Sequence, residues 1–275
     1  MNKLIPVLLM LPLFTPAVFA QDPAQPDRVV VYKSVEGVEL NLHVFEPEGY
    51  DPKTDQRPAI VFFFGGGWMN GSAQQFFRQS RYFADRGMVA MSADYRVFRQ
   101  HNTRPSVCVQ DGKSAMRWIR AHAKELGIDP EKIAAGGGSA GGHVAAATAL
   151  FDEFNEPGED TSVSARPDAL VLFNPVLDTS EEGFGYKQVK AYWEAFSPLH
   201  QVGESAPPTL VMLGTADRLI PVATAEAFRD KMKAAGVRSE LVLYPDQGHG
   251  FFNGARFRET LQAADAFLVS LGWIE

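Results

Sequence analysis

The 275-residue sequence predicts an α/β fold with a mostly parallel, eight-stranded sheet, antiparallel strands at its N-terminal end and helices on both faces. Eight segments have the length and composition of strands, and helical patterns separate the later ones. The first two segments instead alternate apolar and polar residues. No large cap domain is expected, because the leader before these two segments is short.

The first two predicted strands span residues 29–33 and 38–45 around Glu36-Gly37, as in an antiparallel hairpin with one solvated face. The next predicted strand, residues 59–64, is continuously apolar and ends in three glycines, which is typical of a strand covered on both faces. Five further runs share this character: 88–93, 132–135, 169–173, 209–213 and 240–244.

Helical patterns fill the intervals between these strands, and strands that alternate with helices pair in parallel through right-handed crossovers. The predicted helices span 74–86, 107–126, 142–150, 222–235 and 256–271. Two segments, 151–167 and 178–206, resist assignment and are interpreted as loops that line the site. In the second loop, aromatic side chains could cover a pocket or simply pack on the surface: Tyr186, Tyr192, Trp193 and Phe196.

The first twenty residues have the pattern of a secretory signal peptide: Lys3, an apolar stretch, and small residues before a cleavage point after Ala20. A membrane anchor is disfavoured because the stretch is short and contains three prolines. We therefore expect an exported, periplasmic or secreted protein without a membrane anchor, in which residues 21–275 form one catalytic domain.

The composition is that of a globular protein, with 45% hydrophobic and 21% charged residues. Loss of Lys3 with the leader leaves 25 basic against 33 acidic side chains, a net charge of −8, and no basic stripe. Nucleic acid and anionic membranes are therefore not expected partners. The single Cys108 excludes an internal disulfide and is expected to be buried. Neither H-x-x-x-H spacing nor a cysteine cluster occurs, so neither metal nor cofactor is expected.

Gly137-Gly138-Ser139-Ala140-Gly141 is a G-x-S-x-G sequence between a predicted strand and a predicted helix. A serine on so tight a turn needs tiny neighbours and stands at the carboxyl edge of the sheet. Without its context, this five-residue motif could equally be a glycine-rich turn that only connects the strand to the helix. The context instead predicts that Ser139 is a nucleophile, which needs a base and an orienting acid.

His249 is the best candidate base, because it follows the last predicted strand between two glycines. His143 is closer in sequence, but it lies on the helix after Ser139 and is expected to pack or cap. Asp217, just beyond the strand 209–213, is the favoured acid, with Asp178 as the alternative. Asp94 precedes the serine and is expected to be structural.

A tetrahedral intermediate also needs donors for its developing negative charge. The three glycines that follow Phe64 let backbone amides approach a ligand closely. The expected oxyanion donors are the amides of Gly66, Gly67 and Ala140. A phosphate-binding loop is the rival interpretation, but no G-K-[ST] follows the glycines.

With these motifs the chain, from about residue 38 onward, resembles the α/β-hydrolase superfamily, and within it small bacterial esterases similar to hormone-sensitive lipase and to feruloyl and acetylxylan esterases. The resemblance rests on five motifs: Phe64-Gly65-Gly66-Gly67-Trp68, Ala93-Asp94-Tyr95-Arg96, Gly137-Gly138-Ser139-Ala140-Gly141-Gly142-His143, Gly214-Thr215-Ala216-Asp217 and Gly248-His249-Gly250-Phe251. Two departures stand out: Phe64 replaces the histidine usual before the three glycines, and Gly138 replaces an aspartate found before the serine in many members.

The resemblance implies a serine carboxylester hydrolase in which Ser139, His249 and Asp217 form the triad. Its expected substrates are small-molecule or polysaccharide-linked acyl esters. A peptidase related to the prolyl oligopeptidases, and a non-catalytic binding protein on the same fold, are the alternatives.

Overall fold

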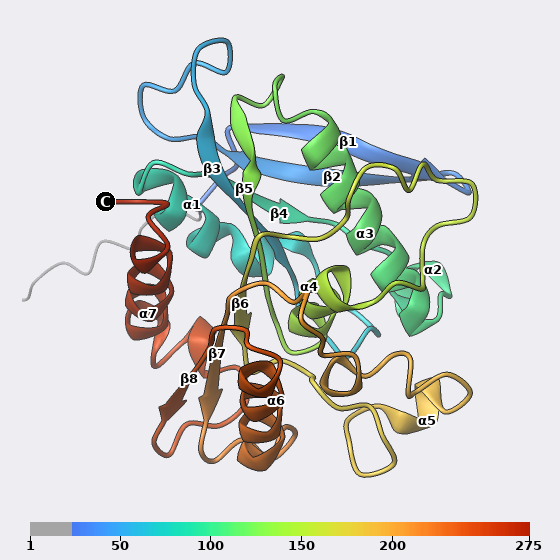
Figure 1. Cartoon of the computed structure of the whole chain (residues 1–275). Coiled ribbons are helices and arrows are strands. Elements are labelled where there is room, and N and C mark those ends of the chain that lie inside the picture. Colours follow the sequence, from blue (N-terminus) through green and yellow to red (C-terminus); the bar gives the residue numbers. More distant parts are fainter. Residues whose placement is uncertain (1–23) are drawn as a thin grey trace, which may run out of the picture.

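The computed structural model describes residues 24–275. The predicted signal peptide lies outside this range. Eight strands form one sheet in the order β1-β2-β4-β3-β5-β6-β7-β8 (Figure 1). They are β1 (Arg28–Val35), β2 (Val38–Phe45), β3 (Arg57–Phe63), β4 (Val89–Ala93), β5 (Ile128–Gly138), β6 (Ala169–Phe173), β7 (Thr209–Gly214) and β8 (Ser239–Tyr244).

Only the pairs β1–β2 and β2–β4 are antiparallel, and every other neighbouring pair in the sheet is parallel. This confirms the predicted sheet and its antiparallel N-terminal strands. The inner strands β4, β6 and β7 are buried along their whole length, as their continuous apolar runs require. In β1 half-buried and exposed residues alternate from Arg28 to Val31 instead, because one face of the hairpin is solvated.

Helices cover both faces of the sheet. On one face, α1 (Phe77–Asp85) contacts α7 (Phe257–Ser270); on the other, α3 (Pro105–Ala121) packs against α4 (Ala140–Leu150), with α6 (Val222–Ala234) beside β7 and β8 (Figure 1). Short helices complete the chain: η1 (Ala73–Phe76), α2 (Phe98–His101), α5 (Tyr186–Val189), η2 (Pro198–His200) and η3 (Phe251–Asn253).

Two predicted segments, the helix 107–126 and the strand 132–135, have wrong boundaries. The helix predicted to reach residue 126 ends at Ala121, because the chain turns back there to start β5. That strand begins at Ile128, four residues before the predicted start, where Ile128 pairs with Arg57 of β3. In the described residues, no helix has both the length and the apolar character needed to cross a bilayer.

Candidate active site

Ser139 lies in the turn between β5 and α4, with φ 55° and ψ −121°, a conformation that few residues other than glycine adopt. The turn closes because its neighbours have no side chains. A Cβ atom on Gly137 would lie 2.5 Å from the backbone of Gly141, and one on Gly141 would lie 2.1 Å from the carbonyl oxygen of Phe63. Such a turn holds the serine hydroxyl out from the carboxyl edge of the sheet.

The structure brings Ser139, His249 and Asp217 together from three separate loops. His249 Nε2 lies 2.9 Å from Ser139 Oγ, and His249 Nδ1 lies 2.7 Å from Asp217 Oδ2. Because a carboxylate only accepts hydrogen bonds, Nδ1 carries the proton, and the lone pair of Nε2 is left to accept the serine hydroxyl. The arrangement can therefore remove a proton from Ser139.

The side chain of Asp217 is fully buried. Burial alone would raise its pKa, but hydrogen bonds from His249 and from the amides of Ile220 and Leu219 outweigh that effect, and the net pKa lies below the usual 3.8. Asp217 is thus a carboxylate held in one orientation, as its proposed role requires. Asp178, the alternative acid, bonds to Ser180 and Ser197 instead.

Of the three residues whose amides are predicted to bind an oxyanion, Gly66 and Gly67 line one cavity with Ser139 and His249, and Ala140 directly follows Ser139. Within residues 24–275, the amides of Gly66, Gly67 and Ala140 have no hydrogen-bond acceptor. Gly66 and Gly67 have φ of +138° and +64°, and a Cβ atom on Gly66 would lie 1.9 Å from the carbonyl oxygen of Asn70. The loop therefore needs glycine to present its amides.

Phe64, in the place of the usual histidine, supports this loop through packing. Its ring stacks on Tyr95 with centroids 4.0 Å apart, and the Tyr95 hydroxyl donates to the carbonyl oxygen of Phe64. Gln75 supplies the polar support, because its Oε1 accepts the amide of Gly65 at 2.5 Å. Sequence reasoning missed Gln75; its only sequence signal was a polar residue at the start of the helix after the glycines.

Gly138, in the place of the usual aspartate, has a steric explanation. A Cβ atom there would lie 2.3 Å from the ring of Phe252, which is too close for two carbon atoms that are not bonded to each other. Phe252 follows His249 by three positions and packs on Phe173 with ring centroids 5.0 Å apart. The aromatic ring thus occupies the space that an aspartate side chain would need.

Ser139, His249 and the glycine loop 65–67 line this cavity, which has a volume of about 450 Å³. Besides glycines, Ser139 and His249, its lining consists of carboxamide and apolar side chains: Asn70, Gln75, Asn174, Asn253, Phe184, Leu219 and Phe252. Asn174, which directly follows β6, was also missed by sequence reasoning. Its only signal was a polar residue at the carboxyl end of a buried strand.

Only one of the two loops predicted to line the site does so. Within the described chain, residues 178–206 reach the cavity through Phe184, whereas Phe196, one of the four aromatic candidates, is wholly buried beside Trp68 and His143. The other three candidates do not line the cavity either.

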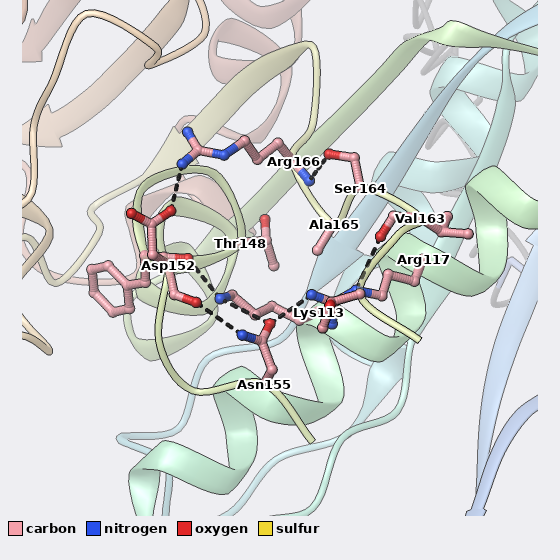
Figure 2. A pocket seen from close by; sticks show the side chains of 11 residues that line it. Lys113, Arg117, Thr148, Asp152, Asn155, Val163, Ser164, Ala165 and Arg166 are labelled. Atoms are coloured by element: carbon pink, nitrogen blue, oxygen red, sulfur yellow. Dashed lines mark hydrogen bonds and ion pairs between the residues drawn. The ribbon is translucent and has the colours of Figure 1, made fainter. Parts of the chain in front are cut away.

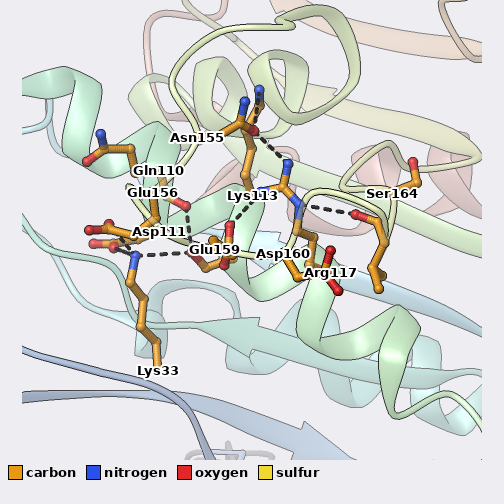
Figure 3. A network of polar contacts seen from close by, with 12 residues as sticks. Lys33, Gln110, Asp111, Lys113, Arg117, Asn155, Glu156, Glu159, Asp160 and Ser164 are labelled. Atoms are coloured by element: carbon orange, nitrogen blue, oxygen red, sulfur yellow. Dashed lines mark hydrogen bonds and ion pairs between the residues drawn. The ribbon is translucent and has the colours of Figure 1, made fainter.

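The loop 151–167 lies over α3 instead, so its predicted role at the site is wrong. Lys113 donates to the carbonyl oxygens of Phe151 and Glu153, and Arg117 donates to the carbonyl oxygen of Val163 (Figure 2). Arg117 also forms an ion pair with Glu159 (Figure 3). A second set of buried charges ties the loop to β1 through Lys33, Asp111 and Glu156 (Figure 3). Charge pairing far from the cavity thus decides the path of this loop.

The remaining candidates are structural, as expected. His143 is fully buried, and burial lowers its pKa to about 4 although Nε2 bonds to the carbonyl oxygen of Phe196. Cys108 is also fully buried. Asp94 accepts a hydrogen bond from Asn41 beside β2. Among the residues the structure describes, no cluster of three His, Cys, Asp or Glu side chains could hold a metal ion.

The chain is similar to known esterases in sequence and in fold. The model of the BD-FAE family matches residues 43–232. The esterase LipC of Mycobacterium tuberculosis is 34% identical over 244 residues, which cover 79% of this chain and 59% of LipC. The acetylxylan esterase of Xylanibacter ruminicola is 27% identical over 239 residues, covering 82% of this chain and 46% of that enzyme. The chain thus spans less than two thirds of the length of these relatives.

A solved structure of Thermogutta terrifontis esterase 2, phosphoramylated by tabun, superposes with a TM-score of 0.86 and is 48% identical. The alignment covers 90% of this chain and 95% of that chain. Another structure of the same esterase, with propionate bound, has a TM-score of 0.86 and 46% identity. On this similarity of sequence and fold, the chain belongs to the BD-FAE family and has the α/β-hydrolase fold of these esterases.

Proposed function

We propose that the chain is an exported serine carboxylester hydrolase in which residues 21–275 form one catalytic domain after cleavage near Ala20. One observation carries the proposal: Ser139, His249 and Asp217 are joined by hydrogen bonds of 2.9 and 2.7 Å next to amides without acceptors. The esterase relatives support the same chemistry.

In the first half-reaction, Ser139 Oγ attacks the ester carbonyl carbon and passes its proton to His249 Nε2. The negative charge that develops on the carbonyl oxygen is stabilised by the amides of Gly66, Gly67 and Ala140, each such donor contributing about 3 kcal/mol. The imidazolium then returns the proton to the leaving alcohol, and an acyl-Ser139 ester remains. In the second half-reaction, water attacks the acyl carbon and passes a proton to His249 Nε2. His249 then returns that proton to Ser139 Oγ, and the carboxylic acid leaves.

Short acyl esters fit the cavity. Its volume of about 450 Å³ is shared between both sides of the ester, and Phe252 closes the wall beside Gly138. Structures of the Thermogutta terrifontis esterase with propionate and with butyrate bound support acyl chains of this length. The acetylxylan esterase among the relatives supports polysaccharide-linked esters as the extended form of the substrate.

The test replaces the nucleophile. Ser139→Ala should lose essentially all turnover of p-nitrophenyl acetate, a fall of about 10⁶-fold in kcat. The matched control is Ser205→Ala, which should leave kcat unchanged. Ser205 is exposed, and among the described residues its side chain bonds only to Arg166. Turnover that persists in Ser139→Ala, with the protein folded, would refute the proposal.

The same proteins separate the alternatives. A fluorophosphonate probe should label the wild type at Ser139 and leave Ser139→Ala unlabelled; an unlabelled wild type would indicate a binding protein. Peptidyl-prolyl anilides should be cleaved far more slowly than acetyl or butyryl esters; the reverse order would indicate a peptidase. Recovery of residues 21–275 from the periplasm or medium would test export.

A further inference from the structure

Asn174 is the buried polar residue next to the nucleophile that no step above uses. It follows β6, is fully buried, and has a positive φ of 36°, which asparagine tolerates better than most residues. The backbone N–H group of Asn174 donates to the carbonyl oxygen of Met212 at 2.7 Å. The backbone of Ser139 bonds to residues on both sides of Asn174. The N–H group of Ser139 donates to the carbonyl oxygen of Phe173 at 3.0 Å, and its carbonyl oxygen accepts from the N–H group of Val176 at 3.1 Å. Asn174 and Ser139 are therefore held in one rigid frame.

The orientation of the Asn174 carboxamide follows from its neighbours. Its Oδ1 lies 3.1 Å from the amide nitrogen of Gly250, which can only donate, so the oxygen must face that group. The amino group, Nδ2, then faces His249 Nε2 at 3.4 Å. The carboxamide thus anchors the histidine loop with one atom and touches the histidine ring with the other.

His249 Nε2 consequently meets two neutral partners that donate, the Ser139 hydroxyl and the Asn174 amino group. The charge in contact with the ring is Asp217, on the opposite nitrogen. Arg218 and Asp246, on the adjoining loops, make no ion pair with His249 among the described residues. With the proton on Nδ1, the single lone pair of Nε2 accepts the Ser139 hydroxyl at 2.9 Å and faces the Asn174 amino group at 3.4 Å, whereas an Nε2–H group would oppose that amino group.

We propose that Asn174 is a positioning residue that holds His249 in the form that accepts a hydrogen bond at Nε2. The inference rests on the proposed esterase function. It has a consequence for the second proton transfer: the imidazolium finds no acceptor in Asn174, so its proton goes to the departing oxygen. Asn174 also limits rotation of the ring, because it anchors Gly250.

The substitution Asn174→Asp isolates this role. Aspartate has the same shape, tolerates positive φ, and keeps an oxygen for the amide of Gly250, but it presents an oxygen instead of an amino group to Nε2. Asn174→Ala removes both contacts. Asn155→Asp is the control, since Asn155 bonds to Arg117 on α3 and does not line the active-site cavity.

The readout is the acid limb of the pH profile of kcat/KM for p-nitrophenyl acetate, with active sites counted by organophosphate titration. In Asn174→Asp the limb should move to higher pH by about 1 unit or more, because a carboxylate favours the imidazolium. In Asn174→Ala it should move the same way by a few tenths of a unit, while kcat falls about tenfold as the histidine loop loosens. Asn155→Asp should match the wild type.

An unmoved acid limb in active Asn174→Asp would overturn the inference and leave the esterase function intact. If Asn174→Asp does not fold, an acid limb of kcat/KM in Asn174→Ala at the wild-type pH would also overturn the inference. If the wild type turns over no ester, the esterase proposal fails, and long-range ¹H–¹⁵N NMR of the histidines still decides the point. The His249 imidazolium should persist to higher pH in Asn174→Asp than in the wild type, and equal titration of the two would refute the positioning role.

Discussion

Substitution of Gly138 by alanine should damage both the stability and the activity of the protein. The added Cβ would lie 2.3 Å from Cζ and 2.9 Å from Cε1 of Phe252, whose side chain is only 2% exposed. The ring cannot retreat freely, because it packs on Phe76 and Phe173 with centroids 5.6 and 5.0 Å away. Overpacking of this kind costs about 1–3 kcal/mol. For a domain of this size, at about 2–4 °C per kcal/mol, we expect the Tm to fall by about 2–12 °C.

Activity should fall because Phe252 lies three residues after His249, so the displaced ring moves the base. A shift of about 1 Å in a reacting group lowers the rate up to about 100-fold, and we expect kcat/KM of Gly138→Ala to fall about 10- to 100-fold. Denaturant unfolding and p-nitrophenyl acetate kinetics measure the two effects. Gly203→Ala is the control, since no atom lies within 4 Å of its added Cβ.

A double-mutant cycle with Phe252→Leu decides the cause. Leucine removes the ring atoms that the new Cβ would meet, so Gly138→Ala should cost about 1–2 kcal/mol less in that background than in the wild type. Equal costs in the two backgrounds, or a Gly138→Ala protein as stable as the wild type, would refute the steric explanation for this glycine.

Three further predictions concern other parts of the site. Asp217→Asn should lower kcat about 10⁴-fold, because the amide favours the wrong histidine tautomer, whereas Asp178→Asn should stay within a few-fold of wild type; equal losses would contradict the assignment of the acid. Gln75→Ala should lower kcat about 10- to 100-fold at little change in KM, because the Gly65 amide loses its acceptor. Gln75→Glu keeps an acceptor oxygen and should restore much of the rate. A normal kcat in Gln75→Ala would show that Gln75 does not support the oxyanion loop. The lowered pKa of His143, about 4 against 6.5 when free, means that the unfolded chain binds an extra proton between these values, so stability is lost as pH falls. His143→Gln should remove about 2 kcal/mol of the loss measured by urea unfolding between about pH 7 and pH 4.5; an unchanged pH dependence would contradict this.

Much of the fold could be predicted because its strands are decided by short-range patterns. Each inner strand is a continuous apolar run, and seven of the eight predicted strands match the observed ones to within two residues at each end: β1, β2, β3, β4, β6, β7 and β8. Boundaries were wrong where a long-range contact decides them, as at Ile128, which belongs to β5 through its pairing with Arg57. No local pattern contains that pairing.

The candidate site divides in the same way. Chain order and strand ends predicted that Ser139, His249 and Asp217 would meet, since the carboxyl ends of parallel strands share one edge of a sheet. The loop 151–167 was misplaced because side chains on α3 and β1, distant in sequence, hold it by charge pairing. The support of the oxyanion loop by Gln75 could not be predicted either, because it depends on one side-chain orientation.

The sequence by itself determined the order of strands and helices, the tight turn at Ser139 and the types of residue at the sheet edge, because backbone sterics and apolar periodicity act over a few residues. Only the tertiary structure decided what surrounds Ser139. Phe252 takes the space beside Gly138, and Asn174 faces His249 from 75 residues away. The reason is physical: close packing and hydrogen-bond direction depend on the placement of whole elements, which no single segment specifies.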